Sequence, residues 1–286
     1  MPATTLEEAA GRFPGRININ VFNKESPMAS ESIHQTRADF KAALKAGKPV
    51  VGAFISVPSP EFVEAAAYGG FDFVVIDAEH GPTGPGEMVH MIRAAQAAEV
   101  AALVRVPLVA KDYVLRALDA GATGILAPHI CGAGEVRELV SECLYPPEGR
   151  RGAAFYARTH RFTRDSGWDV LERSNRELTI GVMIESREGA QHARDICQVP
   201  GLDFVLYGIH DMSVDVGKGE HNSAELEKAG LEIKSAAKEA GIACGIAAST
   251  VELARKRLES GFSMVAIGIV PLLVSAARRY TTGIHA

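Results

Sequence analysis

Hydrophobic residues along this chain gather in short continuous runs that alternate with amphipathic stretches. Runs rich in Val and Ile predict eight strands, at 50–55, 72–77, 101–106, 123–128, 179–185, 203–208, 242–248 and 263–268. Apolar residues at the spacing of one helix face predict helices at 38–47, 60–68, 87–98, 112–119, 134–143 and 224–240. Apolar strands joined by helices are typical of a parallel sheet that is covered on both faces.

Eight strand–helix units match a (β/α)8 TIM barrel, an α/β fold of about 250 residues. The alternative is an open doubly wound sheet, but no GxGxxG motif follows the first strand. We therefore predict a single barrel domain over residues 38–286, preceded by a polar N-terminal extension over residues 1–37. A long insertion over residues 144–178 interrupts the pattern before the fifth strand. Because connections of this length are usually functional, we expect it to contribute to substrate specificity.

Composition excludes several classes of protein. Hydrophobic residues make up 47% and charged residues 23%, as in globular proteins with a large core. Lys and Arg number 30 against 35 Asp and Glu, and this net charge of -5 argues against a nucleic-acid partner. No apolar run is long enough to span a membrane, and the N-terminus lacks the apolar core of a signal peptide. The 4 cysteines show no metal or redox spacing, so we expect reduced thiols in a cytoplasmic protein.

Charged side chains follow several predicted strands, at the end of a barrel where catalytic groups gather. Asp77, Glu79 and His80 end the second strand, Glu185 ends the fifth and Asp211 follows the sixth. Carboxylates on adjacent strands lie about 5 Å apart at the backbone and repel unless a cation or proton lies between them. Oxygen ligands of this kind suit Mg²⁺ or Mn²⁺. The alternative is an acidic pair that is solvated or bridged by an arginine.

Arg105 lies within an apolar strand pattern. Burying a guanidinium is costly unless an anion accompanies it. Arg105 is therefore a candidate for holding a substrate carboxylate or an enolate oxygen. The other interpretation is a structural bridge to Glu79 or Glu185.

Histidines at the strand ends are candidates for acid/base chemistry. His80 stands beside Asp77, a carboxylate that could orient its imidazole as a general base. The alternative interpretation is that His80 is an inert histidine at the start of a loop. His129 and His210 are open to the same two interpretations.

Several motifs, in order along the chain, resemble those of the HpcH/HpaI aldolase family, the class II pyruvate aldolases that cleave 4-hydroxy-2-oxo acids. The resemblance covers roughly residues 38–275, most of the chain. The motifs are IDAEHG at 76–81, LVRVP at 103–107, YPPEGRRG at 145–152, MIES at 183–186 and YGIHDMS at 207–213.

This resemblance implies roles for individual residues. Glu185 and Asp211 are implied to bind a divalent metal, Mg²⁺ or Mn²⁺, with Co²⁺ and Zn²⁺ as alternatives. His80 paired with Asp77 is implied to be the acid/base, and Arg105 to hold the oxo or enolate oxygen. The implied reaction releases pyruvate and an aldehyde through a metal-stabilised enolate. The implied assembly is a homo-oligomer, a hexamer or trimer of dimers, with C-terminal helices swapped between barrels.

Three positions depart from the family pattern. Met183 stands where the family usually has Gln, and its thioether cannot supply the hydrogen bonds of an amide. The stretch from Gly208 to Asp211 contains Ile and His where the family usually has Pro and a variable residue. Phe54 stands where many members have Trp. We expect Gly208, His210 and Met183, together with Arg105, to contact the substrate.

These departures keep other functions open. One is a specialised carbon–carbon lyase or decarboxylase that acts on an oxo acid. A second is a lyase that acts on a CoA thioester, for which the basic cluster at Arg158, Arg161 and Arg164 offers thin support. A third is a barrel that binds a metabolite without catalysis.

Overall fold

The computed structural model describes residues 29–107, 111–217 and 223–285. Eight parallel strands pair in chain order, and β1 also pairs with β8, so the sheet closes into a barrel. This confirms the predicted (β/α)8 fold and excludes the open sheet. The strands are β1 (Val50–Ile55), β2 (Phe73–Asp77), β3 (Ala101–Arg105), β4 (Gly124–Ala127), β5 (Thr179–Ile184), β6 (Phe204–Tyr207), β7 (Ala243–Ala247) and β8 (Met264–Gly268).

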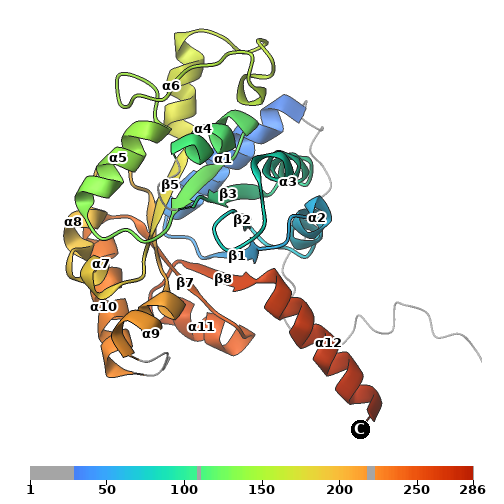
Figure 1. Ribbon diagram of the computed structural model, residues 1–286, viewed down its shortest axis with the longest axis vertical. Coiled ribbons are helices and arrows are strands. Elements are labelled where there is room, and N and C mark those ends of the chain that lie inside the picture. The colour runs from blue at the N-terminus through green and yellow to red at the C-terminus, as the bar shows by residue number, and fades with distance from the viewer. Residues whose placement is uncertain (1–28, 108–110, 218–222, 286) are drawn as a thin grey trace, which may run out of the picture.

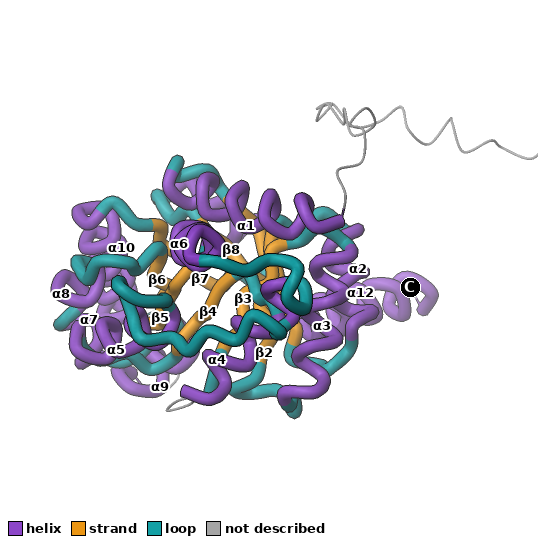
Figure 2. Tube along the Cα trace, turned by 90° about the horizontal axis from the view of Figure 1, so that it is seen from above, coloured by secondary structure: helices purple, strands orange, loops and turns teal. Residues whose placement is uncertain are grey.

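Helices surround the strands (Figures 1 and 2). They are α1 (Ala29–Lys45), α2 (Pro60–Tyr68), α3 (Pro85–Ala97), α4 (Lys111–Ala120), α5 (Ala133–Cys143), α6 (Trp168–Glu177), α7 (Arg187–Gln191), α8 (Ala193–Cys197), α9 (Ile209–Gly217), α10 (Ala224–Ala240), α11 (Val251–Glu259) and α12 (Ile269–His285), with a 3-10 helix, η2, at Arg158–His160. Helix α1 begins inside the predicted N-terminal extension, and residues 1–28 of that extension lie outside the described residues.

Large side chains fill the inside of the barrel because glycines on neighbouring strands leave room for them. Phe73 lies opposite Gly52, and Phe204 lies opposite Gly181. A Cβ atom at either glycine would overlap the facing aromatic ring. Helix α1 adds to this core through Phe40, whose ring centroid lies 5.6 Å from that of Phe73.

The insertion (residues 144–178) lies at the N-terminal ends of the strands. The N–H of Thr179, which follows it, donates to the carbonyl of Thr123, just before β4 (3.2 Å). Arg158 donates to the carbonyl of Ala120 at the end of α4 (3.4 Å). The chain must return to this side of the barrel before β5 can begin. The expectation that the insertion shapes specificity is therefore wrong for its own barrel, whose catalytic end is opposite.

Arginines of the insertion form internal contacts. Arg158 hydrogen-bonds Gln96 of α3, and Arg161 pairs with Asp165. Both guanidinium groups therefore bind the protein itself, at the end of the barrel remote from the strand C-termini. The basic cluster thus gives no support to a nucleotide-binding groove for a CoA thioester.

Buried polar side chains hold the insertion in place. The Tyr145 hydroxyl lies 2.9 Å from His160 Nε2. The Arg151 guanidinium lies 4.4 Å from the Tyr145 ring centroid and pairs with Asp119 at 2.8 Å. Burial, with the positive charges of Arg151 and Arg37, lowers the pKa of His160 below its ordinary value. His160 is therefore neutral at neutral pH.

Acidification from neutral pH to about pH 5 is expected to lower the free energy of unfolding, in part through His160. The unfolded chain takes up a proton at an ordinary histidine pKa of 6.5, whereas folded His160 does so only at lower pH. Stability therefore falls as the pH drops from 6.5 toward the folded pKa. This one group contributes a slope of at most about 1.4 kcal/mol per pH unit.

Urea unfolding at the two pH values tests this expectation. The His160→Gln variant should lose part of the pH dependence. His90→Gln, a substitution of an exposed histidine on α3, should keep the wild-type dependence. Full wild-type pH dependence in His160→Gln would contradict the account.

Candidate active site

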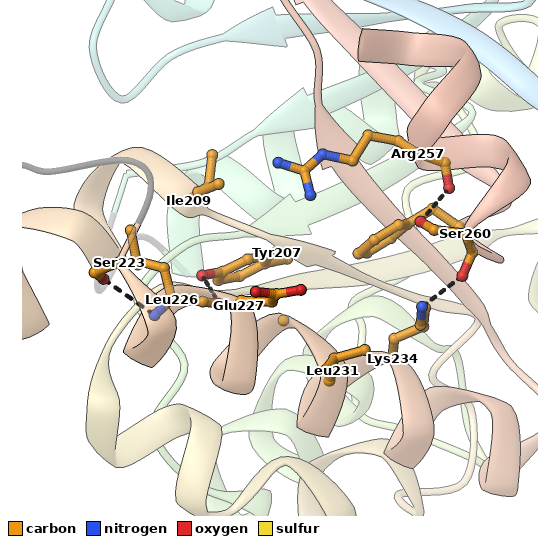
Figure 3. A pocket seen from close by; sticks show the side chains of 11 residues that line it. Tyr207, Ile209, Ser223, Leu226, Glu227, Leu231, Lys234, Arg257 and Ser260 are labelled. Carbon is orange, nitrogen blue, oxygen red and sulfur yellow. Dashed lines mark hydrogen bonds between the residues drawn. The ribbon is translucent and has the colours of Figure 1, made fainter.

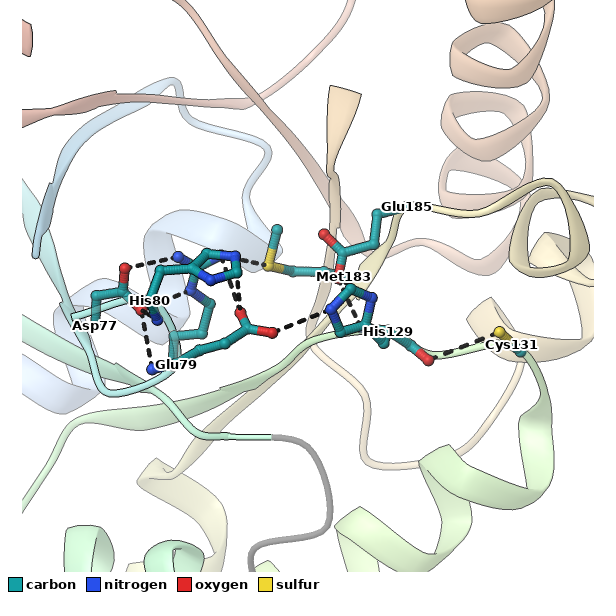
Figure 4. Close-up of polar contacts among 8 residues, drawn as sticks. Asp77, Glu79, His80, His129, Cys131, Met183 and Glu185 are labelled. Carbon is teal, nitrogen blue, oxygen red and sulfur yellow. Dashed lines mark hydrogen bonds and ion pairs between the residues drawn. The ribbon is translucent and has the colours of Figure 1, made fainter. Parts of the chain in front are cut away.

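Polar side chains from β2, β3, β4 and β5 meet at the C-terminal mouth of the barrel (Figure 4). In the register of β2 with β3, Asp77 is the direct partner of Arg105. Partner residues on adjacent parallel strands point the same way, so these two side chains meet inside the mouth. Arg105 Nε donates to Asp77 Oδ1 at 3.0 Å and Nη2 donates to Oδ2 at 2.7 Å.

This two-point ion pair fixes the Arg105 guanidinium. Both residues are buried, and the guanidinium carbon lies 5.0 Å from the Phe54 ring centroid. Burial alone would raise the pKa of Asp77, but the hydrogen bonds and charge of Arg105 outweigh it and hold the pKa below its usual value. Asp77 is therefore ionised under all ordinary conditions. The Nη1 atom of Arg105 lies 3.2 Å from Glu79 Oε2, so the predicted bridge to Glu79 is present.

The structure corrects the predicted pairing of the His80 imidazole with Asp77. The Asp77 carboxylate binds Arg105 and accepts the backbone N–H of Glu79 and of His80, at 3.1 and 3.2 Å. The His80 ring, with 57% of its side chain exposed, has Nε2 at 3.8 Å from Glu79 Oε2. Asp77 thus shapes the turn that carries His80, and Glu79 is the carboxylate that the imidazole approaches.

Glu79 and His129 join the site, although the family motifs implied no role for either. His129 Nε2 lies 3.1 Å from Glu79 Oε1, and its Nδ1 lies 3.3 Å from Glu185 Oε1. His129 has a left-handed backbone, with φ of 54°. A conformation this uncommon for a residue other than glycine is often found at functional sites. The sequence signal was their position, since His129 directly follows a predicted strand and Glu79 lies two residues after another.

Glu185 is a buried carboxylate with one oxygen that accepts no hydrogen bond from the described residues. Its Oε1 accepts the backbone N–H of His129 at 2.7 Å. Its Oε2 is buried and has no hydrogen-bond partner among the described residues. Burial raises the pKa of Glu185, the nearby His129 opposes this, and the charges of Asp211 and Glu79 add to the rise. A carboxylate oxygen in this situation lacks a positive partner.

Asp211 lies in the first turn of α9, half-buried, close enough for its charge to act on Glu185. Two carboxylates and an unpaired buried oxygen suit a divalent cation such as Mg²⁺, which proteins commonly bind through one or two carboxylates. No group of three or more His, Cys, Asp or Glu side chains that could hold a metal occurs in the described part of the chain. The remaining positions would fall to water and substrate.

Gly208 packs directly against Glu185. A Cβ atom at Gly208 would lie 2.5 Å from the Cβ of Glu185 and would overlap its carboxylate. The glycine is therefore a supporting residue for Glu185, whereas the prediction gave it a contact to substrate. That contact stays a prediction.

The Gly208→Ala substitution should push the Glu185 carboxylate out of place, and a displacement of about 1 Å commonly costs a hundred-fold in rate. We expect a loss of about that size in kcat/KM for pyruvate release. Gly86→Ala on α3 is the matched control, since an added Cβ there meets nothing within 4 Å. Equal activity in the two variants would contradict the role of Gly208.

Met183 and His210 occupy different surroundings. The Met183 sulfur is buried and accepts a weak hydrogen bond from Arg105 Nη1 at 3.7 Å. The exposed His210 lies in the first turn of α9, next to Asp211, and its carbonyl accepts the Ser213 hydroxyl at 2.6 Å. Met183 therefore touches the group that is expected to bind substrate, and His210 lies at the rim.

This chain is similar to proteins of a known family. The family model for HpcH/HpaI aldolase/citrate lyase matches residues 51–276. A hydroxypyruvate/pyruvate aldolase from Paraburkholderia phytofirmans is 34% identical, and the alignment covers 79% of this chain and 89% of that protein. A 4-hydroxy-2-oxo-heptane-1,7-dioate aldolase from Shigella sonnei is also 34% identical, with 83% of this chain and 91% of that protein covered.

A solved structure has the same fold. The HpcH/HpaI aldolase/citrate lyase family protein from Burkholderia cenocepacia superposes with a TM-score of 0.83 at 29% identity, and the match covers 87% of this chain and 100% of that one. The resemblance that was expected from the ordered motifs is therefore confirmed.

Proposed function

Because this chain belongs to the HpcH/HpaI aldolase/citrate lyase family, we propose that it is a lyase that cleaves a 4-hydroxy-2-oxo acid into pyruvate and an aldehyde. The observation that carries this proposal is the unpaired buried oxygen of Glu185, beside Asp211 and at the same end of the barrel as Arg105. These groups would supply a cation site and a fixed positive charge at one end of the barrel, as an enolate requires.

Glu185 and Asp211 would hold the divalent metal, either Mg²⁺ or Mn²⁺. When bound, the metal supplies a Lewis acid to the oxygen atoms of the oxo acid. Asp77 and Glu79 fix the Arg105 guanidinium. Apart from Glu79, the Nη1 atom of Arg105 contacts the sulfur of Met183, which is a weak hydrogen-bond acceptor. That N–H is available to the oxygen that becomes negative during cleavage.

His80 is the proposed acid/base. It would accept the proton of the 4-hydroxyl group as the bond between C3 and C4 breaks and the aldehyde forms. The electron pair of that bond passes to the pyruvate enolate, and protonation of its C3 atom completes the product. Asp77 acts on His80 by positioning, since its carboxylate holds the backbone of the turn.

The proposed assembly is a hexamer or trimer of dimers with swapped C-terminal helices. Helix α12 leaves the barrel and extends away from it (Figures 1 and 2). It exposes the apolar side chains of Leu272, Leu273, Val274, Tyr280 and Ile284. A neighbouring barrel would cover this surface.

No helix within the described residues has the length and apolar character needed to cross a membrane, and we propose a cytoplasmic location.

The substrate class is tested by offering the purified protein, with Mg²⁺ or Mn²⁺, a panel of 4-hydroxy-2-oxo acids that differ beyond C4. Pyruvate release is followed through lactate dehydrogenase and NADH. The proposal expects turnover of at least one member of the panel. Binding of pyruvate by calorimetry without any turnover, including aldol addition to a panel of aldehydes, would instead favour a binding protein.

A further inference from the structure

A groove lies on the outside of the barrel between α10 and α11 (Figure 3). It encloses about 410 Å³, a volume in the range of small-molecule sites. None of the residues of α11, which forms one side of the groove, is fully buried. It is on the helix layer, separate from the mouth that holds Glu185 and Arg105.

The floor of the groove is aromatic. Tyr207 points outward from β6, is 1% exposed, and donates its hydroxyl to the carbonyl of Leu226 at 3.0 Å. Gly230 of α10 leaves space for the ring, since a Cβ atom there would lie 3.0 Å from Tyr207. Phe262 lines the far end, and Leu231 lies at the rim with 53% of its surface exposed. The two rings are covered, so an apolar body of a ligand would lie against Leu231 and Ile209.

Two cations line the same groove. The Arg257 side chain extends from α11 across the groove toward Ile209 (Figure 3), and its charge acts on the Tyr207 hydroxyl. Its Nε atom is buried and has no hydrogen-bond partner within the described ranges. Lys234 Nζ lies 5.3 Å from the Phe262 ring centroid. The one carboxylate among the residues that line the groove, Glu227, is exposed.

We propose that this groove binds a small organic anion, a carboxylate attached to an apolar body. Arg257 would bind the carboxylate, because its buried N–H lacks an acceptor and guanidinium groups match carboxylates in geometry. Leu231 and Ile209, the more accessible apolar residues of the lining, would contact the apolar part. Two cations against one exposed carboxylate favour a negative ligand over a neutral or positive one.

The groove shares a stretch of chain with the catalytic mouth. Tyr207 and Ile209 line the groove, whereas Gly208 between them packs against Glu185. Asp211 follows two residues after Ile209 in the same helix, α9. A ligand in the groove would therefore contact the segment that carries a proposed metal ligand.

Benzoate is a suitable probe, and its binding to the full chain can be measured by calorimetry or saturation-transfer NMR. We expect Arg257→Gln to weaken binding about ten-fold, the effect of losing one hydrogen-bonded charge pair. Arg255→Gln changes an exposed arginine of the same helix that does not line the groove, and it should bind as wild type does. Benzamide is neutral, so it should bind the wild-type protein no more tightly than benzoate binds Arg257→Gln.

The proposal would be overturned by an absence of saturable benzoate binding, and equally by the same affinity in the Arg257 and Arg255 variants. The second result would place benzoate elsewhere, for example at Arg105. Should Arg257→Gln fail to fold, Leu231→Asp at the exposed rim puts a negative charge into the groove and should weaken binding similarly. Unchanged affinity in that variant would also contradict the proposal.

Discussion

Replacing Glu185 with glutamine is expected to lower kcat/KM for pyruvate release by about a thousand-fold, which corresponds to about 4 kcal/mol. Glutamine has the same shape, so it still fits against Gly208, and its amide oxygen can still accept the N–H of His129. It lacks the negative charge. The loss therefore reports the cation that the carboxylate would hold, without the collapse that a smaller side chain could cause.

Glu188→Gln is the matched control, because Glu188 is exposed on α7 only three residues further along the chain. That variant should retain wild-type activity. Calorimetry with Mn²⁺ should show weaker binding to Glu185→Gln and unchanged binding to Glu188→Gln. A Glu185→Gln enzyme with near wild-type kcat/KM would remove Glu185 from the mechanism.

Replacing Arg105 with glutamine is expected to lower both stability and activity. The substitution leaves the buried Asp77 and the partly buried Glu79 without their cation, and breaking a buried pair in this way costs about 3–5 kcal/mol of unfolding free energy. Removing a donor aimed at developing negative charge lowers the rate by about a hundred-fold or more. Urea unfolding and the pyruvate assay measure the two effects separately.

A second substitution distinguishes the two roles of Arg105. Adding Asp77→Asn to Arg105→Gln removes the negative charge of Asp77, which has lost its cation. Stability should therefore partly return while activity stays low. Recovery of activity together with stability would mean that Arg105 acts only as a structural bridge. Arg116→Gln, at an exposed position on α4, controls for the loss of an arginine and should change neither quantity.

The hydrophobic pattern alone predicted the strands closely, within one residue at either end of each. Strands such as β2 and β5 are buried along their whole length, so they appear in the sequence as uninterrupted apolar runs. The side of the barrel on which the insertion lies was predictable in principle. A segment between a helix and the next parallel strand has to lie at the N-terminal ends of the strands.

Pairing within the site depended on geometry that the pattern does not contain. Asp77 meets Arg105 because β2 and β3 are in that register, and apolar runs alone do not specify how two parallel strands align. His80 follows three residues later, beyond the end of the strand, and its ring turns toward Glu79. His129 contacts Glu79 and Glu185 from a left-handed backbone conformation. The presence of a histidine in the sequence does not predict this conformation.

We expect carbon–carbon cleavage to depend on a divalent metal held by Glu185 and Asp211. The most direct test follows pyruvate release from a 4-hydroxy-2-oxo acid substrate before and after treatment with EDTA, and again after addition of Mg²⁺ or Mn²⁺. EDTA is expected to abolish the release, and either metal should restore it in the wild type but not in Glu185→Gln. Undiminished pyruvate release in EDTA would show that cleavage does not need the metal.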